Sequence, residues 1–235
     1  RALAARDKFT FDEFAALPFD AFVYLADEWV PKLIAQWDKD MAKDPDRHKA
    51  LAETVEVVRA WDRRAAVDSV ATTVFMLWFE GTCLKKKEAP EWTDALHGVV
   101  KKLKADFGTW KVAWGKINRH QRVDRSKSKT FSDDLASLPA PGVDSSTGAF
   151  FAYRSKQPKG EKRRYGITGR GYAATIEFGP TPRARSILPY GQSDDPASAY
   201  WFDQAPLYVA GKMKSVYFTR EEVEAHAVRS YRPGE

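Results

Sequence analysis

Residues 171–190, GYAATIEFGPTPRARSILPY, hold the clearest local pattern in the chain. Alternate positions of the first half share one face and are apolar: Tyr172, Ala174, Ile176 and Phe178. Such alternation is typical of a β-strand. The run Gly-Pro-Thr-Pro at 179–182 is typical of a turn, and residues 184–190 are expected to return as the partner strand. The sequence therefore predicts a β-hairpin late in the chain.

Upstream of the hairpin, the character of the chain changes. Residues 119–170 are rich in Lys, Arg, Ser, Gly and Pro with little periodicity, which predicts long loops with short strands. Before about Gly108, apolar residues recur at helical spacing instead. Helices are predicted from a capping box at Thr10–Glu13, from near Phe19 through Trp37 with a kink or restart at Pro31, over 47–60, over 67–78 with Gly81 as the stop, and over 93–107.

A second capping box, Thr219-Arg220-Glu221-Glu222, predicts a short helix near the C-terminal end. The order is thus helices, then strands, then a helix, which is an α+β arrangement. We expect a helical region over residues 1–115 and a strand- and loop-rich region over 116–235. The two regions are not expected to be independent domains.

Composition favours a packed globular protein. The chain has 235 residues, 43% of them hydrophobic, with 8 Trp, 9 Tyr and 14 Phe, enough to bury a sizeable core. The net charge is +6, and locally basic stretches occur at 85–87, 119–129 and 154–170. No recognised nucleic-acid-binding motif accompanies them. We therefore interpret them as solvated loops, with salt-dependent retention on nucleic acid as the test of the alternative.

Cysteine usage and hydropathy exclude several classes of protein. Cys83 is the single cysteine, so neither an intramolecular disulfide nor a cysteine-based metal site can form within the chain. No run of about 18 apolar residues is present, and no transmembrane helix is expected. The chain opens with Arg1-Ala2-Leu3 rather than with Met, which is expected of a processed or truncated piece of a longer protein.

Motifs for metal or nucleotide binding are weak. His48, His97, His120 and His226 do not lie at metal-binding spacing on one helix, and no metal or cofactor is expected. Gly166–Gly171 resembles a glycine-rich loop, but it precedes a strand, whereas a dinucleotide loop follows a strand and opens a helix. We expect these glycines to supply positive φ at a turn.

Two segments could hold a nucleophile in principle. Ser145 and Ser146 lie in Gly142–Gly148, but the Gly-x-Ser-x-Gly pattern is missing, and Asp and Ser in such a segment usually make local turn hydrogen bonds. Cys83 precedes three lysines that could lower its pKa. A lone cysteine is more often a small buried hydrophobic residue, and we favour that interpretation.

A resemblance to a known family adds a function. The segment from Gly191-Gln192-Ser193 through Pro196-Ala197-Ser198 to Asp203-Gln204 resembles the GQS–P-x-S–DQ signature near the C-terminus of penicillin acylase relatives. The closing segment 219–226 and the hairpin also resemble that family. Weaker likenesses lie upstream: Trp61-Asp62 opening a helix that contains Ser69, Trp110 with Trp114-Gly115 and His120, and the opening segments 1–3, 9–13 and 19–20.

The resemblance implies an N-terminal-nucleophile amidohydrolase with an αββα layered core. Members are exported precursors that cut themselves into α and β chains, and the new N-terminal Ser of the β chain attacks the amide, with its own amino group as the base. Arg1 cannot serve as that nucleophile, and Asn118 lies in the wrong segment to be the family's oxyanion Asn. We therefore expect no catalytic, cofactor-binding or metal-binding residue in this chain. Asp203 and Gln204 are expected to hold loop amides.

The sequence thus predicts the C-terminal segment of a penicillin-acylase-like enzyme that cleaves linear N-acyl amides. Its expected role is to supply fold and pocket wall, inert by itself, in a periplasmic or secreted enzyme connected with antibiotic biosynthesis. Acyl-homoserine-lactone and aculeacin-type acylases are the nearer relatives. The expected partners are the α chain, the N-terminal part of the β chain and an N-acyl amide, with no nucleic acid and no membrane. The alternative is a noncatalytic binding or scaffold module that reuses this fold segment.

Overall fold

A computed structural model of the protein describes residues 3–85, 91–232 and 234. The chain divides into two compact units. The larger unit is Phe19–Gly169, and the smaller unit combines Arg1–Pro18 with Arg170–Glu235. Helices and strands occur in both units, so the predicted α+β class is confirmed. The expected division between residues 1–115 and 116–235 stays a prediction.

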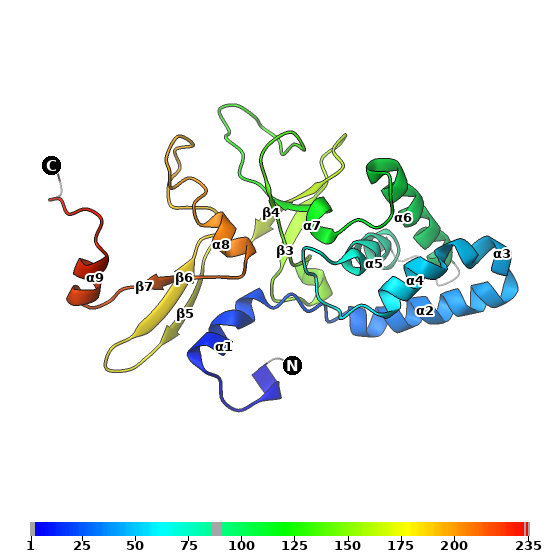
Figure 1. The fold of residues 1–235 in the computed structure, drawn as a ribbon, viewed down its shortest axis with the longest axis horizontal. Coiled ribbons are helices and arrows are strands. Elements are labelled where there is room, and N and C mark those ends of the chain that lie inside the picture. The colour runs from blue at the N-terminus through cyan, green and yellow to red at the C-terminus, as the bar shows by residue number, and fades with distance from the viewer. Residues whose placement is uncertain (1–2, 86–90, 233, 235) are drawn as a thin grey trace. The chain divides into compact units, whose positions relative to one another are not determined.

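In the larger unit, the α-helices precede a small mixed sheet along the chain (Figure 1). Its helices are α2 (Ala26–Lys43), α3 (Pro45–His48), η3 (Lys49–Leu51), α4 (Ala52–Arg59), α5 (Val70–Gly81), η4 (Cys83–Lys85), α6 (Trp92–Phe107), α7 (Trp114–Ile117) and η6 (Ser145–Thr147). Its strands are β1 (Asn118–His120), β2 (Leu138–Pro139), β3 (Tyr153–Lys156) and β4 (Arg164–Gly169), in the order β2-β1-β4-β3. Strands β1 and β4 are parallel, and the other two pairs are antiparallel.

Helix α5 forms the centre of the core. Its buried residues cover most of its circumference: Ala71, Thr72, Thr73, Val74, Phe75, Met76, Trp78 and Phe79. A helix that is apolar nearly all round must be enclosed by others, and α4, α6 and α7 pack against it. The indole of Trp78 is fully buried and donates its Nε1 hydrogen to the Trp92 carbonyl at 3.1 Å. Burial of a ring of this size contributes to the stability of this unit.

Several helix boundaries agree with the sequence and others differ. Helix α6 ends at Gly108, which has a φ of 76°, as its position predicted. The helix expected near Phe19 is wrong in its start, because α2 begins at Ala26 and then runs without a break through Pro31. The predicted 47–60 helix is three shorter elements that begin at Pro45.

The helix expected to open at Trp61-Asp62 is also wrong in its start. Helix α5 begins at Val70, and Ser69 precedes it as the N-cap, accepting a hydrogen bond from the Thr72 amide at 3.1 Å. Residues 61–69 are irregular instead, with a turn at 67–68, because part of this stretch pairs with residues 21–23. The Val23 amide donates to the Arg63 carbonyl at 2.8 Å, and the Ala65 amide donates to the Ala21 carbonyl at 2.9 Å.

The smaller unit contains a three-stranded antiparallel sheet in the order β5-β6-β7. Its elements are η1 (Leu3–Ala5), α1 (Phe11–Ala16), η2 (Leu17–Phe19, which reaches the boundary), β5 (Ala173–Glu177), β6 (Arg183–Ile187), α8 (Ala205–Val209), β7 (Lys214–Val216) and α9 (Arg220–His226). Both predicted capping boxes are present, at the starts of α1 and α9. The predicted hairpin is confirmed as β5 and β6, with Thr175 opposite Arg185.

The two faces of this hairpin differ. Ala173 and Thr175 are buried, on the face against which α1 packs. The residues whose alternation predicted the strand lie on the opposite face, where Ile176 is 49% exposed and Phe178 is 86% exposed. The sequence pattern was therefore correct about the strand. Its apolar face is only partly covered, because Ala184, the partner of Ile176 on β6, is buried while Ile176 and Phe178 are exposed. None of the helices in the described part of the chain is long and apolar enough to cross a membrane.

Candidate functional site

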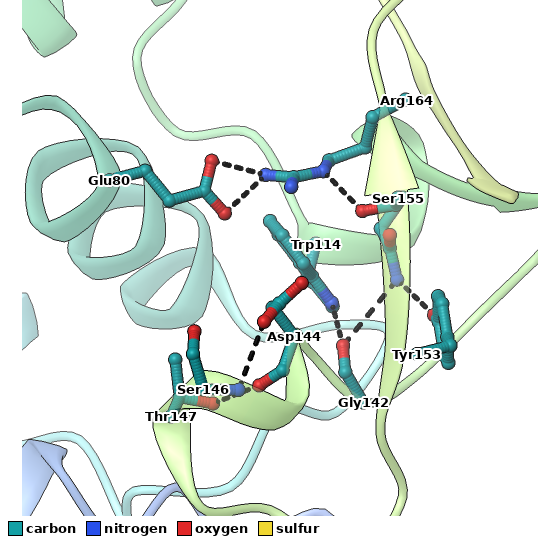
Figure 2. A network of polar contacts seen from close by, with 10 residues as sticks. Glu80, Trp114, Gly142, Asp144, Ser146, Thr147, Tyr153, Ser155 and Arg164 are labelled. Atoms are coloured by element: carbon teal, nitrogen blue, oxygen red, sulfur yellow. Dashed lines mark hydrogen bonds and ion pairs between the residues drawn. The ribbon is translucent and has the colours of Figure 1, made fainter. Parts of the chain in front are cut away.

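The most connected polar network of the larger unit joins α5 to the sheet (Figure 2). Glu80, at the end of α5, holds the guanidinium of Arg164 on β4 through contacts of 2.8 and 2.9 Å from Nη1 to the two carboxylate oxygens. Arg164 Nε donates to the Ser155 hydroxyl on β3 at 2.7 Å. The guanidinium carbon also lies 5.5 Å from the ring centroid of Trp114. We call these four residues the polar junction.

The polar junction is largely removed from water. The side chain of Arg164 is 10% exposed, and that of Glu80 is 27% exposed. A charge in such a place is tolerated only when it is paired and hydrogen-bonded, and Arg164 meets both conditions. The junction therefore orients α5 against β3 and β4. It was not predicted from the sequence.

Asn118 organises the backbone next to this junction. Its side chain is fully buried, and Nδ2 donates to the Ala140 carbonyl at 2.8 Å and to the Tyr153 hydroxyl. The Trp114 indole donates to the Gly142 carbonyl at 2.8 Å, a neighbouring acceptor of the same loop (Figure 2). Asn118 Oδ1 is buried without a hydrogen-bond partner among the described residues. These contacts fix residues 140–142 above the sheet.

The segment that contains Ser145 and Ser146 is a local turn. The Asp144 carboxylate accepts the Ser146 amide at 2.9 Å, and the Thr147 hydroxyl donates to the Asp144 carbonyl at 2.6 Å (Figure 2). Gly148 closes the turn with a φ of 81°. Both serines are exposed. The Asp144 side chain is thus used on the backbone of its own loop, as the composition predicted.

Two of the three glycines in residues 166–171 belong to a strand rather than to a loop. Gly166 and Gly169 lie in β4, opposite β3, and neither has a positive φ. The expectation that they supply positive φ at a turn is wrong. The reason for glycine here is space: a Cβ at position 169 would lie 2.7 Å from the Tyr153 Cβ, and one at 166 would lie 3.3 Å from the Tyr153 ring.

The four histidines fall into different environments. His48 and His97 meet between α3 and α6, with Nδ1 of His48 3.2 Å from Nε2 of His97. His120 is buried on β1, and His226 stacks on Tyr217 in the smaller unit at 4.0 Å between ring centroids. Within the described ranges, no group of three or more His, Cys, Asp or Glu residues is placed to hold a metal ion.

Cys83 follows α5 in the short helix η4, where it packs against the hydrophobic core. Burial raises the pKa of its thiol, against the opposing effect of a hydrogen bond with Thr82. The thiol is therefore not held as a thiolate. Of the three lysines that follow, Lys86 and Lys87 lie outside the described residues.

The Gly191–Gln204 loop is held by its own hydrogen bonds. Gln204 is 3% exposed, and its Oε1 accepts the Leu188 amide at 3.0 Å while its backbone amide donates to the Tyr190 carbonyl at 2.9 Å. Position 191 requires glycine, because a Cβ there would lie 2.1 Å from the Tyr200 carbonyl oxygen. The expected amide-holding role is thus present at Gln204, whereas the Asp203 side chain makes no hydrogen bond among the described residues.

Further turns within this loop follow the same principle. The Ser193, Asp195 and Ser198 side chains each accept a backbone amide two residues further along, at 2.9 to 3.1 Å. The loop therefore satisfies its own backbone groups. The absence of a catalytic residue in the chain stays a prediction.

Comparison with known proteins shows the family of the chain. The penicillin amidase family matches residues 1–225. The acyl-homoserine lactone acylase PvdQ of Pseudomonas fluorescens is 26% identical, over 88% of this chain and 28% of that protein. Its counterpart in Pseudomonas putida is 24% identical, over 91% of this chain and 28% of that protein.

The chain thus spans less than a third of the length of these relatives. Within that span, the family match covers the helices of the larger unit, the polar junction and the Gly191–Gln204 loop. A match of this extent is sufficient to place the whole chain. This protein belongs to the penicillin amidase family.

Proposed function

We propose that the chain is the C-terminal segment of an amidohydrolase that cleaves linear N-acyl amides by an N-terminal nucleophile. The observation that carries this proposal is the penicillin amidase match over residues 1–225. The relatives named above are acyl-homoserine lactone acylases, so a fatty N-acyl amide is the proposed substrate class. The remainder of the enzyme would supply the nucleophile.

The proposed contribution of this chain is to support the reaction centre rather than to react. In the larger unit, polar groups such as Arg164 and Asn118 are engaged with other parts of the same chain. Side chains held in this way give a rigid wall, and a rigid wall keeps a bound substrate in one geometry. The α chain and the N-terminal part of the β chain are the proposed partners. A periplasmic or secreted location and a role in antibiotic biosynthesis belong to the same proposal.

The test uses the full-length protein. Each chain of the purified material is identified by intact mass and N-terminal sequencing. The same sample is assayed against a fatty-acyl homoserine lactone and a phenylacetyl amide. We expect a chain that begins with Ser and contains residues 1–235, and hydrolysis should follow this chain through every column.

A matched control replaces that Ser with Ala, which should abolish hydrolysis and leave the fold intact. If residues 1–235 alone hydrolyse either substrate, the supporting role proposed for this chain is wrong. If the full-length protein folds but hydrolyses neither amide, the noncatalytic scaffold becomes the better explanation.

A further inference from the structure

Two segments of the larger unit together carry a net charge equal to that of the whole chain. Residues 119–134 and 154–163 together contain ten Lys or Arg and four Asp or Glu, which gives +6. The whole chain has 38 basic and 32 acidic residues, so the rest of it holds 28 of each and is neutral. Charge concentrated in this way produces a local positive potential.

The structure brings the two segments together. Asp133, in the first segment, accepts the backbone amides of Lys162 at 2.9 Å and Arg163 at 3.3 Å in the second. In return, the Asp133 amide donates to the Glu161 carboxylate at 2.6 Å. The loop before β2 therefore lies beside the hairpin between β3 and β4 (Figure 1). We call this combined region the basic surface.

The same contacts occupy two of the four carboxylates in the region. Asp133 also accepts the Tyr165 hydroxyl at 2.6 Å. Burial opposes ionisation of Asp133, but the hydrogen bonds from Tyr165 and the two backbone amides hold its pKa below the ordinary value. These carboxylates are directed at backbone groups and are poorly placed to neutralise the lysines around them.

Four lysines of the basic surface are exposed and have no ion pair among the described residues: Lys129, Lys156, Lys159 and Lys162. Leu135, the residue after the first segment, is 41% exposed. Phe131 and Tyr165 stack on each other with ring centroids 5.4 Å apart, and Tyr165 is fully buried. The surface thus offers the charges of these lysines and of the exposed Arg125 and Arg154, while these two rings are occupied by each other.

This combination distinguishes two kinds of anionic partner. Proteins that bind single-stranded nucleic acid stack bases on exposed aromatic rings, whereas Phe131 and Tyr165 are stacked on each other. Binding to an anionic membrane surface requires only several positive charges near the phosphates. Apolar side chains that enter the headgroup boundary add to the binding.

We propose that the basic surface binds the phosphate-rich face of an anionic phospholipid membrane. A contact of this kind needs no membrane-spanning segment. The proposal therefore departs from the sequence-based expectation that the protein has no membrane partner. The binding itself does not depend on the proposed amidase function. If both hold, the surface brings the enzyme to the layer into which fatty N-acyl substrates partition.

The test measures binding of the full-length protein to vesicles of phosphatidylcholine alone and to vesicles with about a third phosphatidylglycerol. We expect binding to the anionic vesicles only, weakening as salt shortens the Debye length. A triple variant, Lys156→Gln, Lys159→Gln and Lys162→Gln, should lose affinity by about fivefold for each lysine, or about a hundredfold in all.

The matched control removes the same charge from exposed lysines of α2 and α6, as Lys39→Gln, Lys101→Gln and Lys104→Gln. It should keep its affinity within about threefold of the parent. The proposal is overturned if the parent does not bind anionic vesicles at low salt, if the two triple variants lose affinity equally, or if duplex DNA binds while vesicles do not. Amide hydrolysis, measured on soluble substrate, should be the same in all three proteins, so this outcome is independent of the amidase test.

Discussion

The two units of this protein differ in how completely they bury their apolar side chains. The hydrophobic core cluster lies within the larger unit, from Val23 to Ala149. Of the 17 large hydrophobic side chains that are exposed among the described residues, 12 lie in the smaller unit, although it has fewer residues. The open face of the hairpin contributes Tyr172, Ile176 and Phe178 to that number.

The difference shows where each unit obtains its stability. The larger unit encloses α5 with helices of its own, so burial within the unit can hold it together. The smaller unit depends on a three-stranded sheet whose second face is only partly covered, and small sheets of this kind are marginal unless something packs on them. A large exposed apolar face usually marks an interface, which agrees with the proposed role of this chain as one segment of a longer enzyme.

The largest loss of stability is expected when the core of the larger unit is opened. Trp78→Ala removes a fully buried ring and its hydrogen bond to Trp92, and should lower the free energy of unfolding by about 3–5 kcal/mol. Ile176→Ala, on the open face of the smaller unit, should cost less than about 1 kcal/mol. Chemical denaturation of both variants measures the contrast. Equal losses would show that the hairpin face is buried in the assembled protein.

The next largest effect is expected at the polar junction. Arg164→Met leaves Glu80 half-buried without its partner, and should cost about 2–3 kcal/mol. Since both side chains are partly accessible, the loss should fall below that of a fully buried pair. Denaturation of the single variant, compared with the parent, gives this value.

A double variant tests whether this loss comes from the unpaired charge of Glu80. Glu80→Met combined with Arg164→Met removes the unpaired charge, and should recover at least half of the loss. Arg164→Lys keeps the charge but loses the paired geometry and the Ser155 contact, so it should fall between the parent and Arg164→Met. If the two single losses simply add, Glu80 and Arg164 are not energetically coupled.

A smaller effect is expected at Gln204, the anchor of the smaller unit. Gln204→Ala leaves the Leu188 amide without its acceptor and should cost about 1–2 kcal/mol. Amide hydrogen exchange of residues 187–191 is the appropriate measurement, because the opening is local. Ser193→Ala, on the exposed part of the same loop, is the matched control and should change exchange little.

Local signals predicted much of this fold. The stripe of α6 and its Gly108 stop, both capping boxes and the 171–190 hairpin each depend on residues close together in sequence. Residues 20–25 and 61–69 were misassigned as helix because their conformation depends on each other. Phe22 forms a bridge with Arg64, and apolar spacing within either segment contains no information on that pairing.

The functional features also divide into those formed by residues close in sequence, which were predicted, and those formed by distant residues, which were missed. The role of Gln204 was predicted because its partners lie in the preceding residues of one motif. The polar junction was missed because Glu80 and Arg164 are 84 positions apart, and each alone resembles an ordinary surface charge. Asn118 was considered only as a catalytic group, although its position at the end of α7, where β1 begins, is consistent with a buried backbone anchor.

The smallest effect concerns pH and the larger unit alone. His48 and His97 face each other between α3 and α6 at 3.2 Å. Burial, with additional contributions from His48 and Arg47, lowers the pKa of His97, while Asp94 opposes this change. The neutral pair can share one hydrogen, whereas two protonated rings would direct hydrogens at each other.

The sign of the effect follows from that lowered pKa. The unfolded chain binds a proton at His97 more readily than the folded chain does, so protonation favours unfolding. The stability of the α3–α6 contact should be complete above pH of about 6.5, the ordinary value for histidine, and should fall as the pH drops below it. Hydrogen exchange across α3 and α6 between neutral and mildly acidic pH measures this. His97→Gln should flatten that pH dependence, and an unchanged profile in the variant would place its origin elsewhere.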